Sequence, residues 1–209
     1  MSISNKMHNI KEGTQRFIES IDNELSLFRG CPVVNGVKFF GMQFEEKIDE
    51  WYKICMKNIS SSPNTMHKYG SKGALTSCDI DYLLVGLRQF INDYFEDHAN
   101  SEKTLYLYQQ FSVHYSSVTD KKLDEHMDDS DITINICLKN TINDLSTHIN
   151  FVDTPRTLFS KKSNKSFQVS LKKCEIMIHK GNQIHSVSNL ISLNENSERC
   201  NIILWLKYR

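Results

Sequence analysis

Four side chains in the second half of the chain are of the types that bind a metal ion and an anion side by side. His126 and Asp128 stand two positions apart within residues 123–138, and His185 and Arg199 follow later in the chain. Two imidazoles and one carboxylate on one face of an octahedral metal ion leave three positions open. The set therefore predicts a metal centre that can also take a chelating small molecule and O2.

This combination favours Fe(II) together with a 2-oxo acid. A single carboxylate leaves an Fe(II) site with residual positive charge, which suits a chelating acid. Arginine pairs with a carboxylate through two parallel hydrogen bonds, so we expect Arg199 to hold the distal carboxylate of such an acid. Alternation along the last segment puts Asn201, Ile203 and Trp205 on the same face as Arg199.

The histidines and the aspartate also have an interpretation without chemistry. His126 and Asp128 lie in a run of acidic residues typical of a solvated turn, and an H-x-D pair arises easily by chance. His185 has two competitors for the role of third ligand, His179 and His148. We prefer His185 because of the resemblance described below.

Arg199 and the aromatic residues have similar alternatives. Arg199 is beside Glu198 and near Glu195, so a surface ion pair is the competing interpretation. Tyr115 would be a core tyrosine, and Trp205 is assigned to packing.

The elements that must position these residues change character near residue 100. Before it, apolar residues recur at helical spacing in 44–59 and 79–95, and less clearly in 6–28. After it the period is two, and no helical segment of the length needed for a parallel crossover intervenes, which favours an antiparallel sandwich or jelly roll with helices outside. The expected strands are 104–115 (one long or two short), 131–138, 165–171, 174–179, 184–188 and 199–206.

Composition narrows the class of protein. The formal net charge is zero, so neither nucleic acid nor an anionic membrane is an expected partner. We find no signal peptide and no apolar run long enough to span a membrane, so we expect an intracellular protein of the cytoplasm or nucleus. The scattered cysteines include no C-x-x-C pair, which argues against a disulfide framework or a structural zinc site: Cys31, Cys55, Cys78, Cys137, Cys174 and Cys200.

Four segments, in the same order, resemble the Fe(II)- and 2-oxoglutarate-dependent oxygenases, in particular the prolyl and lysyl hydroxylase-like members and proteins named as 2-oxoglutarate and iron-dependent oxygenase domain-containing, type 2. HMDDSDITINICL is similar to their H-x-D-x-S-x-x-T-x-N-x-x-L segment, and FSVHY to the strand before it. HKGNQIHSVS is similar to L-H-x-G-x-x-x-H-G, and ERCNIILWLKYR to E-R-x-N-L-x-x-W-L-R. The resemblance covers roughly residues 104–209.

The resemblance implies an α+β fold: a double-stranded β-helix (a cupin-like jelly roll) over 104–209, with a mostly helical support region over 1–103, integrated into one domain. It implies that Fe(II) binds the two histidines and Asp128, with 2-oxoglutarate and O2 as co-substrates and ascorbate as a possible further requirement. The implied metal ligands are His126, Asp128 and His185, and the implied co-substrate contacts are Arg199, Tyr115, Asn135 and Asn201.

The implied activity is hydroxylation of an unactivated C–H, in a protein or peptide side chain, coupled to decarboxylation of 2-oxoglutarate to succinate and CO2. Two departures stand out: NTINDLSTHINF (140–151) replaces a G-G-x-L-x-F segment, and Ser186 replaces the glycine after the distal histidine. The alternatives are a nucleic-acid N-demethylase of the same chemistry and a non-catalytic jelly-roll binding module. The lysine-rich segment 161–173 is expected to be a solvated hairpin, and the oligomeric state is open.

Overall fold

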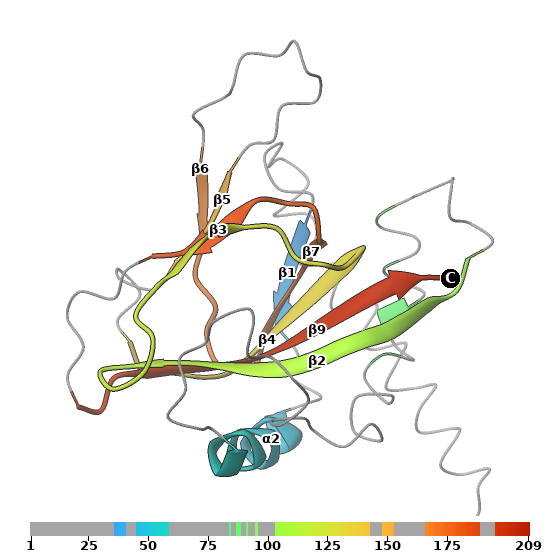
Figure 1. Cartoon of the computed structure of the whole chain (residues 1–209). Coiled ribbons are helices and arrows are strands. Elements are labelled where there is room, and N and C mark those ends of the chain that lie inside the picture. The colour runs from blue at the N-terminus through green and yellow to red at the C-terminus, as the bar shows by residue number, and fades with distance from the viewer. Residues whose placement is uncertain are drawn as a thin grey trace, which may run out of the picture.

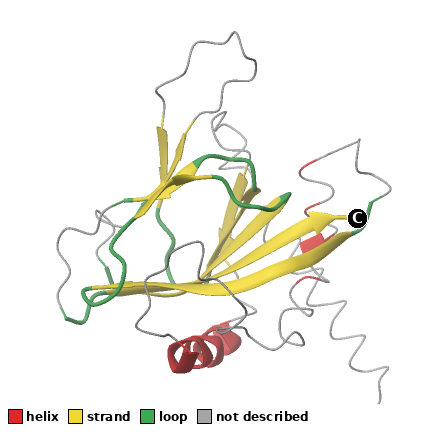
Figure 2. Ribbon diagram, in the orientation of Figure 1, coloured by secondary structure: helices red, strands yellow, loops and turns green. Residues whose placement is uncertain are grey.

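The computed structural model describes residues 36–40, 45–58, 84, 87, 88, 91, 95, 103–142, 148–152, 166–188 and 195–209, and two antiparallel sheets and one 14-residue helix make up most of these residues. The larger sheet has the order β1-β7-β4-β9-β2, and the smaller has the order β3-β8-β5-β6. Together they form a jelly-roll-like β-sandwich, with helix α2 (Glu45–Asn58) outside the larger sheet (Figures 1 and 2).

The strands of the larger sheet are β1 (Gly36–Phe40), β2 (Leu105–Ser116), β4 (Ile132–Asn140), β7 (Glu175–Lys180) and β9 (Glu198–Tyr208). Those of the smaller sheet are β3 (Leu123–His126), β5 (Ile149–Val152), β6 (Ser166–Val169) and β8 (His185–Val187).

The prediction of an antiparallel sandwich with a helix outside is confirmed. The segment expected at 104–115 is one long strand with an irregularity between Leu107 and Gln109. Three short strands were not predicted: β1, which lies inside the region expected to be mostly helical, and β3 and β5. The predicted helix 44–59 is α2, and the described residues of 79–95 are helical, whereas 6–28 lies outside the described residues.

Alternation on β4 determines where the core lies. Ile132, Ile134 and Ile136 face α2, while Thr133 and Asn135 face the inside of the sandwich. Both faces of this strand are buried, because the helix covers one and the smaller sheet covers the other. The layer between α2 and the sheet also contains buried residues of the helix and of neighbouring strands, among them Ile48, Trp51, Cys55, Leu84, Leu87, Ile91, Ile176, Ile178, Cys200, Ile202 and Leu204.

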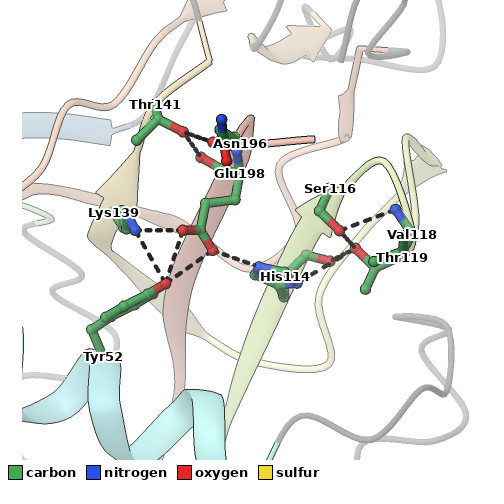
Figure 3. A network of polar contacts seen from close by, with 9 residues as sticks. All are labelled: Tyr52, His114, Ser116, Val118, Thr119, Lys139, Thr141, Asn196 and Glu198. Atoms are coloured by element: carbon green, nitrogen blue, oxygen red, sulfur yellow. Dashed lines mark hydrogen bonds and ion pairs between the residues drawn. The ribbon is translucent and has the colours of Figure 1, made fainter. Parts of the chain in front are cut away.

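A polar network joins α2 to three strands around Glu198 (Figure 3). The Glu198 carboxylate accepts a hydrogen bond from the Tyr52 hydroxyl at 2.9 Å, lies 3.0 Å from His114 Nε2 and pairs with Lys139. Burial opposes ionisation of Glu198, but the hydrogen bonds from Lys139, His114 and Tyr52 prevail and lower its pKa. The partners of Glu198 therefore all lie on the face of β9 that is turned toward α2. The alternative in which Arg199 forms a surface ion pair with Glu198 is wrong, because Arg199 is buried.

Two further sequence expectations concern the cysteines and membrane-spanning segments. Four cysteines are free and buried, namely Cys55, Cys137, Cys174 and Cys200, while Cys31 and Cys78 lie outside the described residues. No helix in the described part of the chain is long and apolar enough to cross a membrane.

The packing of α2 makes a prediction about stability. Ile48 is only 1% exposed between the helix and the sheet, so Ile48→Ala should lower the free energy of unfolding by about 2–5 kcal/mol through lost burial and a residual cavity. Urea unfolding followed by circular dichroism measures this, and Lys53→Ala, on the exposed side of α2, is the control. Equal midpoints for the two variants would contradict the packing of α2 on the sheet.

Candidate metal centre

The two predicted histidine ligands face each other across neighbouring strands. His126 is the last residue of β3 and His185 the first of β8, and the two are direct partners in the antiparallel register. Their ring centroids lie 4.3 Å apart. His126 therefore ends a strand of its own, which argues against the alternative interpretation of a solvated acidic turn.

Asp128 lies on the short connection from β3 to β4, and Gly181 holds that connection in place. The Asp128 amide donates to the Gly181 carbonyl at 2.9 Å, and the Gly181 amide donates to the Asp131 carbonyl at 3.0 Å. A Cβ on Gly181 would overlap the backbone oxygen of Ser130. The glycine is thus required by close approach of two backbones, and it sets the position of the carboxylate.

The three predicted ligands converge. One ligand atom from each of His126, Asp128 and His185 lies within 4.8 Å of the other two. The Oδ1 atom of Asp128 is 3.5 Å from His126 Nε2 and 3.8 Å from His185 Nε2. Both imidazoles donate Nδ1–H to a backbone carbonyl, of Asp124 at 2.8 Å and of Gln183 at 2.9 Å. Because the carbonyls accept only, each neutral ring directs the lone pair of Nε2 inward, as a metal ligand must.

Burial and neighbouring charges shift the pKa values of the three predicted ligands in different directions. Burial opposes ionisation of Asp128, but its hydrogen bonds and the neighbouring imidazoles prevail and lower its pKa to about 2. Burial lowers the pKa of His185 to about 4. Burial also acts against protonation of His126, yet the contact with Asp128 outweighs it and raises the pKa of His126. At neutral pH the centre thus presents a carboxylate and a neutral His185.

Arg199 lies at the other end of the same pocket. Its side chain is 1% exposed, and its buried Nη1 atom has no hydrogen-bond partner in the described part of the chain. Among the described residues no carboxylate pairs with it; its Nε–H donates a hydrogen bond to Asn201 Oδ1 at 3.2 Å. Leaving a buried cation unpaired is costly, so this end of the pocket fits an anionic group.

The other predicted contacts surround Arg199. Tyr115 is its register partner on β2, with the guanidinium 5.8 Å from the ring centroid. Burial raises the pKa of Tyr115 to about 12, so its hydroxyl keeps a proton to donate. Asn201 does not line the pocket; its amide donates to Asn135 Oδ1 and its oxygen accepts from Arg199, so it orients the guanidinium.

The structure adds residues to the site that the sequence did not assign. Thr133 donates to Asp128 Oδ2 at 2.6 Å, and His179 Nε2 lies 3.9 Å from the same oxygen. Trp205, expected only to pack, lines the pocket beside Phe111, and its buried Nε1 atom has no hydrogen-bond partner among the residues that the structure describes. The rest of the described lining is apolar: Val113, Leu123, Ile149, Val187 and Ile203. Alternation on β4 and β9 is the signal that placed Thr133 and Trp205 on this face.

This protein matches known proteins by its structure and not by its sequence. No protein-family model matches the sequence, and no curated protein matches it either. Solved structures do match. A 2OG-Fe(II) oxygenase family oxidoreductase from Burkholderia pseudomallei is 10% identical, with a TM-score of 0.60 over 89% of both chains. HygX from Streptomyces hygroscopicus, with nickel and 2-oxoglutarate bound, is 10% identical, with a TM-score of 0.58 over 88% of this chain and 85% of that one.

A prolyl-4-hydroxylase from Pseudomonas putida is a further match. It is 11% identical to this chain, with a TM-score of 0.53 over 84% of this chain and 89% of that one. At these identities the likeness shows a shared fold. The resemblance inferred from the four sequence segments is confirmed at that level.

The role of Gly181 is testable. Gly181→Ala should push the connection that carries Asp128 out of place, because the new Cβ meets the Ser130 backbone. We expect Mn(II) affinity, measured by titration calorimetry, to fall about tenfold or more, the usual cost of disturbing the support of a metal ligand. Asn182→Ala, at the exposed neighbouring position, should bind as wild type does. Wild-type affinity in Gly181→Ala would show that the close approach does not set the carboxylate.

The raised pKa of His126 predicts a pH dependence. A proton and a metal ion compete for Nε2, so metal affinity should fall as pH drops through the pKa of His126, which lies above its ordinary value of 6.5. Calorimetric Mn(II) titrations between about pH 8 and about pH 6 measure the effect. His148→Gln, outside the pocket lining, should show the wild-type profile. An unchanged affinity over this range would contradict the assignment of His126 as a ligand.

Proposed function

We propose that this chain is an Fe(II)- and 2-oxoglutarate-dependent dioxygenase built on a double-stranded β-helix. The observation that carries the proposal is the pairing, in one pocket, of a convergent His-Asp-His set with a buried arginine that has no carboxylate partner among the described residues. The matching fold of solved 2-oxoglutarate oxygenases supports it.

The residues present fit both groups. His126, Asp128 and His185 would hold the metal, and Arg199 would hold the distal carboxylate of 2-oxoglutarate through a charge-assisted pair. The Tyr115 hydroxyl would donate to the same carboxylate, and Asn135 and Asn201 would keep the guanidinium in place. Bound Fe(II) supplies the O2 chemistry in which R–H, O2 and 2-oxoglutarate give R–OH, succinate and CO2.

The chain's own contribution is placement and exclusion of water. The apolar residues that line the pocket keep solvent from the reacting atoms, and they offer a dry surface to a substrate C–H. The hydrogen bonds from the Asp124 and Gln183 carbonyls fix the imidazole tautomers before any metal arrives.

We further propose that the substrate is a protein or peptide side chain, and that residues 1–103 form a support integrated with the 104–209 core. The support for this substrate class is the resemblance of the motif segments to prolyl and lysyl hydroxylase-like proteins, together with the match to a solved prolyl-4-hydroxylase. The packing of α2 on the larger sheet supports the integration of the two regions.

The proposal predicts separable losses in two variants. Anaerobic addition of Fe(II) and then 2-oxoglutarate should produce a visible charge-transfer band in the wild type. Asp128→Ala should lose the band and the release of succinate. Arg199→Ala should keep metal affinity but weaken 2-oxoglutarate binding about 30-fold or more, since it removes one partner of a buried charge pair.

Arg209→Ala is the matched control, because it removes an exposed arginine from the end of the chain. It should behave as the wild type does in both titrations. A folded wild-type protein that binds Fe(II) and 2-oxoglutarate but never forms succinate with any peptide would favour the alternative of a binding module. Tight, salt-sensitive binding of a methylated oligonucleotide would favour the demethylase.

A further inference from the structure

His179 is a third imidazole beside the proposed metal centre. It lies on β7, opposite Thr133 of β4 in the register, and its side chain is 3% exposed. Its ring contacts that of His185 edge-on at a centroid distance of 4.9 Å and that of Phe151 at 5.3 Å. It therefore reaches the centre from the larger sheet, whereas His126 and His185 come from the smaller one.

The hydrogen bonding of His179 repeats that of the two proposed ligands. Its Nδ1 atom lies 2.9 Å from the Lys180 carbonyl, so Nδ1 carries the proton and donates it there. The Nε2 atom then faces Asp128 with its lone pair, at 3.9 Å from Oδ2. This distance is close to the 3.8 Å that separates His185 Nε2 from Oδ1.

The two oxygens of Asp128 have different surroundings. Oδ1 faces the Nε2 atoms of His126 and His185, which makes it the oxygen directed at an ion between them. Oδ2 accepts a hydrogen bond from Thr133 and faces His179. Thr133 is itself 2.9 Å from the Ser130 hydroxyl, so this side of the carboxylate is held by the larger sheet.

We propose that His179 is a positioning residue that, together with Thr133, keeps Oδ2 of Asp128 away from the ion, so that Asp128 offers a single oxygen. The inference rests on the metal centre proposed above. Nε2 and Oδ2 are both acceptors and lie 3.9 Å apart, a separation that one bridging water spans, and we assign the link between them to such a water. A carboxylate bound through both oxygens would use a coordination position that the co-substrate or O2 requires.

Two substitutions separate this role from simple packing. His179→Phe keeps a ring against Phe151 and His185 but removes both nitrogens. His179→Gln places an amide near the position of Nε2, where it can hydrogen-bond to the same water or to Oδ2. His148→Phe replaces another histidine of the smaller-sheet region, outside the pocket lining, and is the control. The melting temperature of each variant reports whether it folds.

Anaerobic titrations with Co(II) and Mn(II), without co-substrate, are the measurement. We expect His179→Phe to bind Mn(II) about tenfold or more weakly than wild type and to change the visible absorption of the Co(II) form, because the carboxylate changes its mode of binding. His179→Gln should restore most of the affinity and the wild-type Co(II) spectrum. His148→Phe should match the wild type in both.

The outcomes are distinct. If His179→Phe keeps the wild-type affinity and Co(II) spectrum, the inference is overturned while the metal centre stands. Equal losses in His179→Gln and His179→Phe, with unchanged melting temperatures, would also overturn it, because the hydrogen-bonding group would then not matter. If the wild-type protein binds neither ion, the proposed function fails first.

Discussion

The Asp128 carboxylate is the point at which the two sheets of this protein depend on each other. Two of the imidazoles directed at it come from the smaller sheet, and a third imidazole and a threonine hydroxyl come from the larger. A carboxylate that faces several imidazole lone pairs is electrostatically unfavourable unless a cation lies between them. The Asp128 carboxylate raises the pKa of the neighbouring His126, which is the effect expected of an uncompensated negative charge at this point.

Arg199 completes a charge pattern along the pocket. A buried cation at one end and a carboxylate with imidazoles at the other leave room for a molecule that is anionic at its tail and chelating at its head. β9 supports both sides of this arrangement, because its residues alternate between the pocket and the layer under α2. Glu198, next to Arg199 in sequence, points to the opposite face, where it pairs with Lys139 and lies within hydrogen-bonding distance of His114 Nε2. The strand thus keeps the two opposite charges from pairing.

Much of this could be predicted because period-two alternation is local. Along β4 and β9 this alternation correctly assigned which residues share a face. Together with the H-x-D spacing, it identified His126, Asp128 and Arg199 as candidates, and the fold places all three in one pocket. The short strands β1, β3 and β5 were missed, since four or five residues such as LDEH or INFV contain too few alternations to stand out from a loop. Only pairing with neighbouring strands makes them strands.

The sequence by itself determined His126 and Asp128 as candidate ligands, the inward-facing arginine, the antiparallel sandwich and the helix over it, because residue type and periodicity carry that information directly. The choice of His185 among the other histidines came from the resemblance to the oxygenase segments. Only the tertiary structure decided that His126 and His185 are register partners, that Gly181 must be a glycine because the Ser130 backbone touches it, and that His179 Nε2 lies beside Oδ2 of Asp128. Those facts depend on strand register and on the approach of two sheets. Both arise from contacts between residues far apart in the chain, and no spacing within a single segment encodes them.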